Sequence, residues 1–293
     1  MGADELSKSQ IFIRRLSSSL FLWGLLLAGL FYKDRTIADG AFILLLALLV
    51  TSGLWEFFAL AKFTGLSSHR TLGVIGGMAL VGTVFYLSAK GSSRSSVAES
   101  EILILALMLI STTLWHLFRG EIGKGIQSIS ITFLGVLYVA LLLGFFTKMR
   151  FYEGIKGEWF LLYFILITKA SDTGAYLTGS LIGRHKMIPR ISPGKTWEGF
   201  AGAIILSIIA SALMKKYAGH HLIGMTWTHT IALGAGLGVT AVLGDLVESL
   251  FKREAGQKDS GHLFPGLGGI LDVLDSLLLN APIMYIYIRC VHP

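Results

Sequence analysis

The sequence is poor in charged residues, in cysteine and, over most of its length, in proline. Only 15% of its 293 residues are Asp, Glu, Lys or Arg, whereas a soluble domain usually carries about 25%. This shortage argues against an ordinary soluble fold and against intrinsic disorder. The single cysteine, Cys290, excludes an internal disulfide framework and is compatible with a reducing compartment. All five prolines lie in the last 105 residues, from Pro189 onward.

Long apolar runs are what the sequence has in abundance. Hydrophobic residues make up 53% of the chain and its mean hydropathy is +0.68. A helix that crosses a bilayer needs about 20 mostly apolar residues, and nine segments qualify. They are residues 16–32, 40–61, 71–88, 102–118, 126–146, 159–183, 199–214, 230–251 and 268–290. Because backbone groups in hydrocarbon must be paired internally, the sequence predicts an all-α fold, a polytopic membrane bundle of about nine transmembrane helices.

Charged residues inside the spans divide the chain into two parts. Six of them interrupt three of the last four spans: Lys169, Asp172, Asp245, Glu248, Asp272 and Asp275. Intramembrane charges of this kind mark functional sites. We therefore predict an N-terminal transmembrane scaffold of about five spans (1–157). A C-terminal catalytic region of about four spans plus cytoplasmic loops follows (158–293). Glu56 lies near the end of its span, and we interpret it as reaching the membrane interface. The most flexible connection is expected at 89–101.

Asp272 and Asp275 are the first candidate site. Three residues apart on a helix, they occupy neighbouring positions of one face. The Gly- and Pro-containing segment 265–269 directly before them predicts a helix that begins near Gly269, with Asp272 in its first turn. Two carboxylates and free backbone N–H groups suit a divalent cation together with a phosphate. The alternative is a pair of capping acids at the membrane edge.

Asp245 and Glu248 repeat this spacing in the preceding span. Between the two acidic pairs lies a loop with three cations, Lys252, Arg253 and Lys258, and several acids. An ordinary solvated loop would look similar. Its place between two intramembrane acidic pairs favours a metal–phosphate site, in which cations hold phosphate oxygens and carboxylates hold Mg²⁺.

The third candidate element joins a span to a basic loop. Lys169 and Asp172 are one turn apart, so a simple ion pair is one interpretation. The Pro-bounded loop 184–199 follows and contains a Gly-Lys-Thr triplet that ends at Thr196. We reject a P-loop, because Pro189 stands where that motif requires its first glycine and no strand is expected before it. Ser and Thr hydroxyls of this loop remain candidates for phosphate contacts.

These motifs together resemble the CDP-diacylglycerol synthase (phosphatidate cytidylyltransferase) family. The matching stretches are Ser-Leu-Phe-Lys-Arg at 249–253, Lys-Asp at 258–259, Pro-Gly-Leu-Gly-Gly at 265–269, Asp-Val-Leu-Asp at 272–275, Ser-Asp-Thr-Gly-Ala-Tyr at 171–176 and Ser-Pro-Gly-Lys-Thr-Trp-Glu-Gly at 192–199. The resemblance covers roughly residues 159–290. Leu267 stands where the family often has His, and Val273 where it often has Arg. If those side chains do chemistry elsewhere in the family, that role is absent here or moved, with His262 a candidate substitute for the former.

The resemblance implies transfer of CMP from CTP to phosphatidic acid, which gives CDP-diacylglycerol and pyrophosphate in phospholipid biosynthesis. The implied catalytic residues are Asp245, Lys252, Asp272 and Asp275. Mg²⁺ would be bound by Asp245, Asp272 and Asp275, with room for a second metal or a monovalent cation such as K⁺. The implied substrate-binding residues are Lys169, Asp172, Ser192, Lys195, Thr196, Arg253, Lys258 and Asp259.

The charge distribution points to lipid partners and gives an orientation. Residues 169–198 and 245–275 are formally neutral together, so the net charge of +7 comes from the remainder. It indicates loops beside anionic headgroups, not nucleic acid. The N-terminus and the even-numbered loops hold 14 Lys and Arg against 10 on the other side. We therefore predict a bacterial-type inner membrane protein with its N-terminus inside, its C-terminus outside and a cytoplasmic active site. Glycine-rich spans permit a homodimer.

Two other functions are compatible with parts of the pattern, and a third is less so. A CTP-dependent polyprenol or phytol kinase would resemble this family in its nucleotide region, but it would release CDP and a phosphorylated alcohol. An ion-coupled transporter would also carry intramembrane Asp and Lys residues; the clustering of charges in one half and the lack of repeat symmetry argue against it. The aspartate motif of the CDP-alcohol phosphotransferases is not found.

Overall fold

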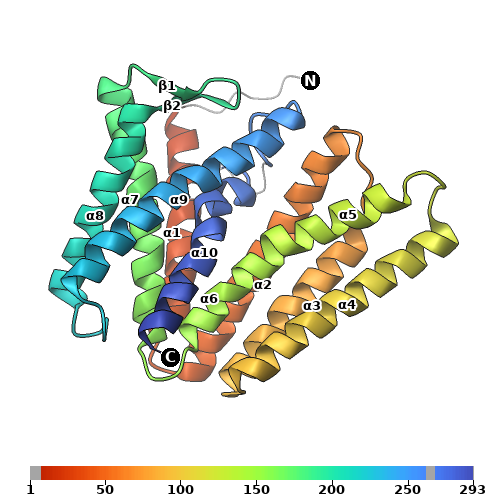
Figure 1. The fold of residues 1–293 in the computed structure, drawn as a ribbon, viewed down its shortest axis with the longest axis horizontal. Coiled ribbons are helices and arrows are strands. Elements are labelled where there is room, and N and C mark those ends of the chain that lie inside the picture. Colours follow the sequence, from red (N-terminus) through yellow and green to blue (C-terminus); the bar gives the residue numbers. More distant parts are fainter. Residues whose placement is uncertain (1–7, 262–267, 293) are drawn as a thin grey trace.

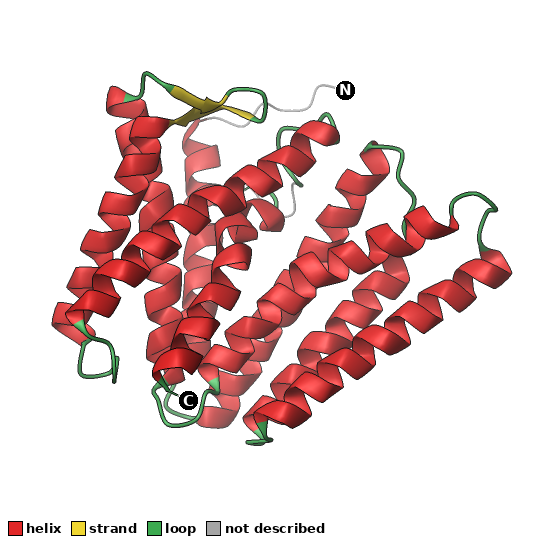
Figure 2. Ribbon diagram, in the orientation of Figure 1, coloured by secondary structure: helices red, strands yellow, loops and turns green. Residues whose placement is uncertain are grey.

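The computed structural model describes residues 8–261 and 268–292 as an almost entirely helical molecule (Figures 1 and 2). Its helices are α1 (Lys8–Phe31), α2 (Arg35–Phe63), α3 (Arg70–Ala89), α4 (Arg94–Arg119), α5 (Gly125–Gly135), the π-helix η1 (Val136–Leu141), α6 (Leu142–Arg150), α7 (Gly157–Ile182), α8 (Trp197–Ala218), α9 (Trp227–Glu254) and α10 (Ile270–Val291). Two short strands, β1 (Lys186–Ile188) and β2 (Ser192–Thr196), lie between α7 and α8.

The helices match the nine predicted spans. Because α5, η1 and α6 form one continuous helix over Gly125–Arg150, the described residues contain nine long helices. Seven of these are long and apolar enough to cross a membrane. Of the other two, α7 carries Lys169 and Asp172 in its middle, and α1 contributes the apolar stretch Leu20–Phe31. The prediction of an all-α polytopic bundle is confirmed, and the chain is an integral membrane protein.

One predicted loop is largely helical. We expected a flexible connection at 89–101, but α4 already begins at Arg94. The hydroxyl of Ser93 accepts the N–H of Ser96 at 3.3 Å and so caps the new helix. Ser is a favoured N-cap residue because its side chain satisfies an N–H that has no partner within the helix. The serine-rich composition that suggested flexibility therefore starts a helix instead.

The predicted basic loop before α8 is a β-hairpin. Strands β1 and β2 pair antiparallel, with Lys186 opposite Thr196, so the all-α description needs this small exception. Glu198, in the first turn of α8, accepts the backbone N–H groups of Arg184 and His185 and holds the base of the hairpin. Thr196 ends β2 and caps α8, since its hydroxyl accepts the N–H of Gly199 at 3.1 Å. The hairpin is thereby fixed to the ends of two transmembrane helices.

Helix α10 occupies the centre of the bundle. It packs against α2, α6, α7 and α9, while α3 and α4 form an edge far from it (Figure 1). Buried residues of helices from both halves of the chain belong to one hydrophobic cluster. The functional division at residue 157 stays a prediction, but the two parts share a packed core. The first turn of α10 lies at the same end of the bundle as the hairpin (Figure 1).

Small residues bring α7 and α8 into close contact. A Cβ added to Gly202 of α8 would lie 2.8 Å from the carbonyl oxygen of Gly174 and would overlap the side chain of Thr178. A Cβ on Gly174 of α7 would lie 2.8 Å from the Cβ of Leu206. Neither backbone has room to yield, so the close approach depends on both glycines. This agrees with the packing role of small residues in membrane helices.

We expect Gly202→Leu to destabilise the protein by about 1 to 3 kcal/mol or more, because the added side chain forces α7 and α8 apart. Gly236→Ala in α9 is the control, since nothing lies within 4 Å of a Cβ at that position. Thermal unfolding in detergent should show a lower midpoint for the first variant only. Equal midpoints for the two variants would contradict this account of the α7–α8 contact.

Candidate active site

Three carboxylates meet where α9 crosses α10. A Cβ on Gly244 would lie 2.5 Å from the carbonyl oxygen of Asp275 and 3.1 Å from the Cα of Ser276, so the two helices touch at this glycine. The contact places Asp245 and Glu248 of α9 beside Asp275 of α10, with one carboxylate oxygen from each within 4.8 Å of the others. Glu248 and Asp275 are buried, at 0% and 8% exposure. Carboxylate oxygens in this number are the ligands that Mg²⁺ and Ca²⁺ prefer.

Lys252 lies between two acids at the edge of this cluster. Its ammonium forms an ion pair with Glu248, one turn earlier in α9, and donates to Asp272 Oδ1 at 2.7 Å. Neither oxygen of Glu248 has a hydrogen-bond donor in favourable geometry among the described residues. A buried carboxylate that lacks donors is costly unless a cation approaches it. Lys252 supplies one such cation at the edge, and a divalent ion between Asp245, Glu248 and Asp275 would supply another, so the residues present fit such an ion.

Asp272 lies in the first turn of α10, as predicted, but its carboxylate points to other partners. Asp272 Oδ2 accepts hydrogen bonds from the N–H of Gly269 at 2.8 Å and from the hydroxyl of Ser260 at 2.9 Å. Lys252 occupies the other oxygen. The sequence named Asp272 as a metal ligand with Asp245 and Asp275, whereas the structure groups Glu248 with those two. A metal-binding role for Asp272 stays a prediction.

Lys169 and Asp172 form the predicted pair deeper in the bundle. Lys169 Nζ lies 2.9 Å from Asp172 Oδ2, and it also donates to the carbonyl oxygen of Val273 at 2.9 Å. Ser276 joins them by donating its hydroxyl to Asp172 Oδ2 at 3.0 Å. The pair therefore ties α7 to α10. Ser276 was not among the predicted site residues, because a serine in an apolar span gives no distinctive signal.

The hairpin brings a second lysine to the acidic cluster. Lys195 Nζ lies 3.0 Å from Asp245 Oδ2 and donates to the carbonyl oxygen of Val242 at 3.0 Å. Ser192, Lys195, Asp172 and Asp245 line a cavity of about 320 Å³. Thr196 also borders this cavity, but it is 4% exposed and its hydroxyl caps α8. Lys195 and Ser192 are thus better placed than Thr196 to contact a phosphate.

The remaining predicted residues lie farther from the carboxylates. Arg253 is exposed and donates to the carbonyl oxygen of Ile191 at 3.0 Å, which joins the end of α9 to the hairpin turn. Lys258 and Asp259 are exposed on the loop after α9. Of the two departures from the family pattern, Val273 lies at the site through its backbone, while Leu267, like the proposed substitute His262, falls outside the described residues.

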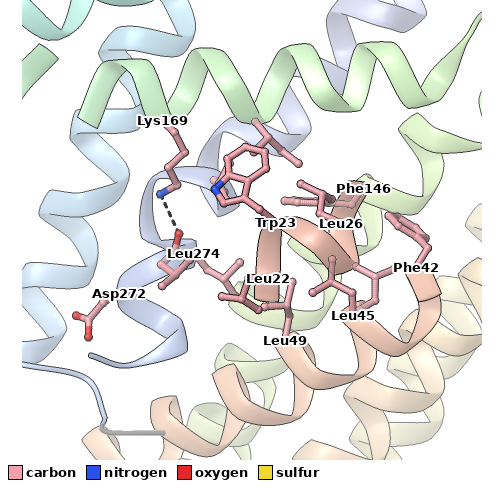
Figure 3. A pocket seen from close by; sticks show the side chains of 14 residues that line it. Leu22, Trp23, Leu26, Phe42, Leu45, Leu49, Phe146, Lys169, Asp272 and Leu274 are labelled. Carbon is pink, nitrogen blue, oxygen red and sulfur yellow. Dashed lines mark hydrogen bonds between the residues drawn. The ribbon is translucent and has the colours of Figure 1, made fainter. Parts of the chain in front are cut away.

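An apolar groove of about 390 Å³ adjoins the site (Figure 3). Apolar residues of α1, α2, α6, α7 and α10 line it, among them Leu22, Trp23, Leu26, Phe42, Leu45, Leu49, Phe146, Ile165 and Leu277. Lys169 and Asp272 are the charged residues of its lining. The groove therefore has an apolar body and a charged margin. This arrangement suits a molecule with a hydrocarbon chain and an anionic head.

Glu56, which we interpreted as reaching the membrane interface, is enclosed by protein. It is 3% exposed, and its carboxylate accepts the N–H groups of Ile270 and Leu271 at 3.0 and 2.8 Å. The reason is that α10 begins inside the bundle, where its free N–H groups need an acceptor. The signal was an acidic residue inside an otherwise apolar span, which indicates function by default.

The geometry defines an integral membrane protein with a charged site between its helices, and comparisons with known proteins identify its family. The chain belongs to the cytidylyltransferase family, whose model matches residues 13–291.

Relatives named phosphatidate cytidylyltransferase occur in several bacteria. The Haemophilus influenzae protein is 40% identical over 45% of this chain and 46% of its own length. The Mycobacterium bovis protein is 36% identical over 59% of each. The match with the first relatives thus spans about half of their length, while the Staphylococcus saprophyticus protein, 32% identical, matches over 82% of this chain and 89% of its own.

Removing the Lys252 ammonium should leave buried Glu248 without its cation and should take one of three partners from Asp272. We expect Lys252→Met to lower stability by about 3 to 5 kcal/mol, the usual cost of breaking a buried ion pair. Adding Glu248→Gln should restore part of the loss, because it removes the unpaired charge. Thermal unfolding in detergent measures both effects, with exposed Lys258→Met as the control. A double variant less stable than Lys252→Met would refute this pairing.

Proposed function

We propose that the protein transfers CMP from CTP to phosphatidic acid and forms CDP-diacylglycerol and pyrophosphate. One observation carries the proposal: a site rich in acids and cations meets an apolar groove at Lys169 (Figure 3). One reactant is a nucleoside triphosphate and the other is half hydrocarbon, so an enzyme for them needs both environments side by side. Membership of the cytidylyltransferase family and the names of its relatives support the same reaction.

Phosphatidic acid would place an acyl chain in the groove and its phosphate at the charged margin. Burial of the chain among leucine and aromatic side chains contributes about 0.8 kcal/mol per CH₂ when the chain comes from water, but much less when it comes from lipid. The groove therefore orients the lipid more than it attracts it. Lys169, which is partly exposed and already bonded to Asp172 and Ser276, would exchange one of these contacts for a phosphate oxygen.

CTP would lie toward the hairpin, in the cavity that Ser192, Lys195 and Asp245 line and where Lys195 contacts Asp245. The phosphate of phosphatidic acid is already ionised, so it needs no enzyme nucleophile and no strong base. One of its oxygens bonds to the α-phosphorus of CTP, and the bond from that phosphorus to the β-phosphate oxygen breaks. The protein must hold two anions together and neutralise the leaving pyrophosphate, a task of positioning and electrostatics. Lys195 and Lys252 contact acids of this cluster, and Arg253 from the end of α9 and Lys258 from the loop after it could join them.

Mg²⁺ fits the cluster of Asp245, Glu248 and Asp275, and these residues would hold it. When bound, it supplies positive charge to the nucleotide phosphates at the reacting end. Asp272 would join this set only by releasing Lys252, Ser260 or Gly269. A second metal ion or a monovalent cation such as K⁺ remains part of the proposal.

The end of the bundle that carries the hairpin would face the cytoplasm, where CTP is found. The nine helices then place the N-terminus inside and the C-terminus outside. The bacterial relatives favour an inner membrane as the location. A homodimer, which the glycine-rich spans permit, stays a prediction.

We expect Asp275→Asn to reduce product formation by about 100-fold or more, because it removes a buried charge from the proposed metal cluster. The assay follows CTP labelled at its α-phosphorus, with phosphatidic acid and Mg²⁺ in detergent, with and without EDTA. The label should enter the lipid and pyrophosphate should appear. Glu99→Gln, an exposed acid on α4, should retain activity. Release of CDP without lipid labelling would point to a kinase, and labelling by Asp275→Asn at the wild-type rate would refute the metal role.

A bulky residue in the groove should act on long acyl chains selectively. We expect Leu49→Trp to lower kcat/KM for long-chain phosphatidic acid about tenfold, because the indole fills space that the chain would occupy. A short-chain analogue should be affected less. Leu44→Trp on the same helix is the control, since Leu44 is 53% exposed and faces away from the core. Equal losses for both chain lengths would argue against the groove as the acyl site.

A further inference from the structure

Glu56 supplies the cap of α10 from a different part of the chain. Helix α10 starts with N–H groups that have no acceptor in the helix itself, and those of Ile270 and Leu271 donate to Glu56 Oε1 and Oε2 at 3.0 and 2.8 Å. A carboxylate is favourable at this position because the N-terminal end of a helix is partly positive. Helix α2, which we assigned to the scaffold, therefore holds the helix that carries Asp272 and Asp275.

The same carboxylate also contacts the loop that follows α9. Ser260 Oγ lies 3.2 Å from Glu56 Oε2 and 2.9 Å from Asp272 Oδ2. A hydroxyl has one proton, so Ser260 donates to only one of these acids at a time. Ser260 thus has two alternative acceptors, one on α2 and one on α10.

Two glycines allow the backbone to close around Glu56. A Cβ on Gly261 would lie 2.5 Å from Glu56 Oε1, and a Cβ on Gly269 would lie 2.5 Å from Glu56 Oε2. The carboxylate is therefore enclosed by backbone on both sides and is 3% exposed. This close enclosure by backbone distinguishes Glu56 from an acid that is buried only because it avoids lipid.

We propose that Glu56 is a positioning residue for nucleotide transfer, which keeps the first turn of α10 and Ser260 in place when Asp272 turns toward the substrate. These contacts form a junction between α2, the first turn of α10 and the loop after α9. In the structure Asp272 is itself part of this junction, through Gly269, Ser260 and Lys252. If the Asp272 carboxylate turns to the nucleotide or to the metal ion, the Ser260 hydroxyl donates to Glu56 instead. Glu56 then holds the junction without Asp272. The inference rests on the proposed function for its kinetic consequence, but not for the contacts themselves.

Both oxygens of Glu56 are needed, which makes conservative variants informative. A glutamine has one acceptor oxygen and an NH₂ group, so it cannot accept from both Ile270 and Leu271 with separate oxygens. An aspartate keeps the charge but is one methylene shorter. We expect Glu56→Gln to retain the fold and to lose the geometry of the junction, and Glu56→Asp to recover part of it.

The experiment uses the full chain in detergent and two kinds of measurement. In the cytidylyltransferase assay, kcat/KM for CTP should fall about 10- to 100-fold in Glu56→Gln, with KM for phosphatidic acid within about twofold of wild type. Hydrogen–deuterium exchange should become faster in peptides that cover 255–261 and 268–273. Ser260→Ala should show a smaller change of the same kind. This variant also tests the proposal if Glu56→Gln fails to fold.

Glu101→Gln is the matched control. Glu101 is also a buried glutamate, 8% exposed and paired with Lys148 at 2.6 Å, but it lies at the other end of the bundle. This substitution should lower the unfolding midpoint and leave both kcat/KM for CTP and the exchange of 255–261 and 268–273 unchanged. The proposal is overturned if Glu56→Gln keeps wild-type kinetics and exchange, or if Glu101→Gln reproduces its effects. If the wild-type protein makes no CDP-lipid, the proposed function fails, and the exchange data still decide whether Glu56 holds the junction.

Discussion

Carboxylates that lie within membrane-spanning helices need hydrogen-bond donors or cations from the same protein, and this need organises the centre of the bundle. Helix α10 begins inside the protein and brings free N–H groups together with Asp272 and Asp275. Glu56 satisfies two of the N–H groups, Lys252 and Ser260 engage Asp272, and Lys169 reaches the backbone of Val273. Three neighbouring helices, α2, α7 and α9, and the loop after α9 are thus tied to one helical turn.

The same arrangement explains why charge is tolerated beside lipid. Lysines on α7, α9 and the hairpin each contact an acid, so most of the buried charge is compensated locally. The group of Asp245, Glu248 and Asp275 is compensated only in part, because Lys195 contacts Asp245 and Lys252 contacts Glu248, while Asp275 forms no ion pair among the described residues. Negative charge therefore exceeds positive charge at this point, and the metal ion and anionic substrate that we propose would use this acidic group and the lysines around it.

Much of the molecule was accessible from sequence because membrane spans are local features. Apolar runs of sufficient length predicted all nine helices, and the Gly- and Pro-containing segment predicted the start of α10. The pairing of Lys169 with Asp172 followed from their spacing within a single helix. The hairpin at 186–196 was missed, because its strands are short and are held by Glu198 from the next helix. The interior role of Glu56 was missed because its partners are more than 200 residues away in the chain.

The sequence by itself determined which segments enter the membrane, which of them carry charge and which family pattern those charges resemble. Each of these depends on residue type and on spacing within one segment. Only the tertiary structure decided that Glu248 joins Asp245 and Asp275, that Asp272 faces Lys252 and Ser260, and that the scaffold helix α2 caps α10. Those choices depend on how closely helices approach, as at Gly244, where the lack of a side chain lets α9 touch α10. Contact between distant segments is set by packing of the whole bundle, and no local pattern encodes it.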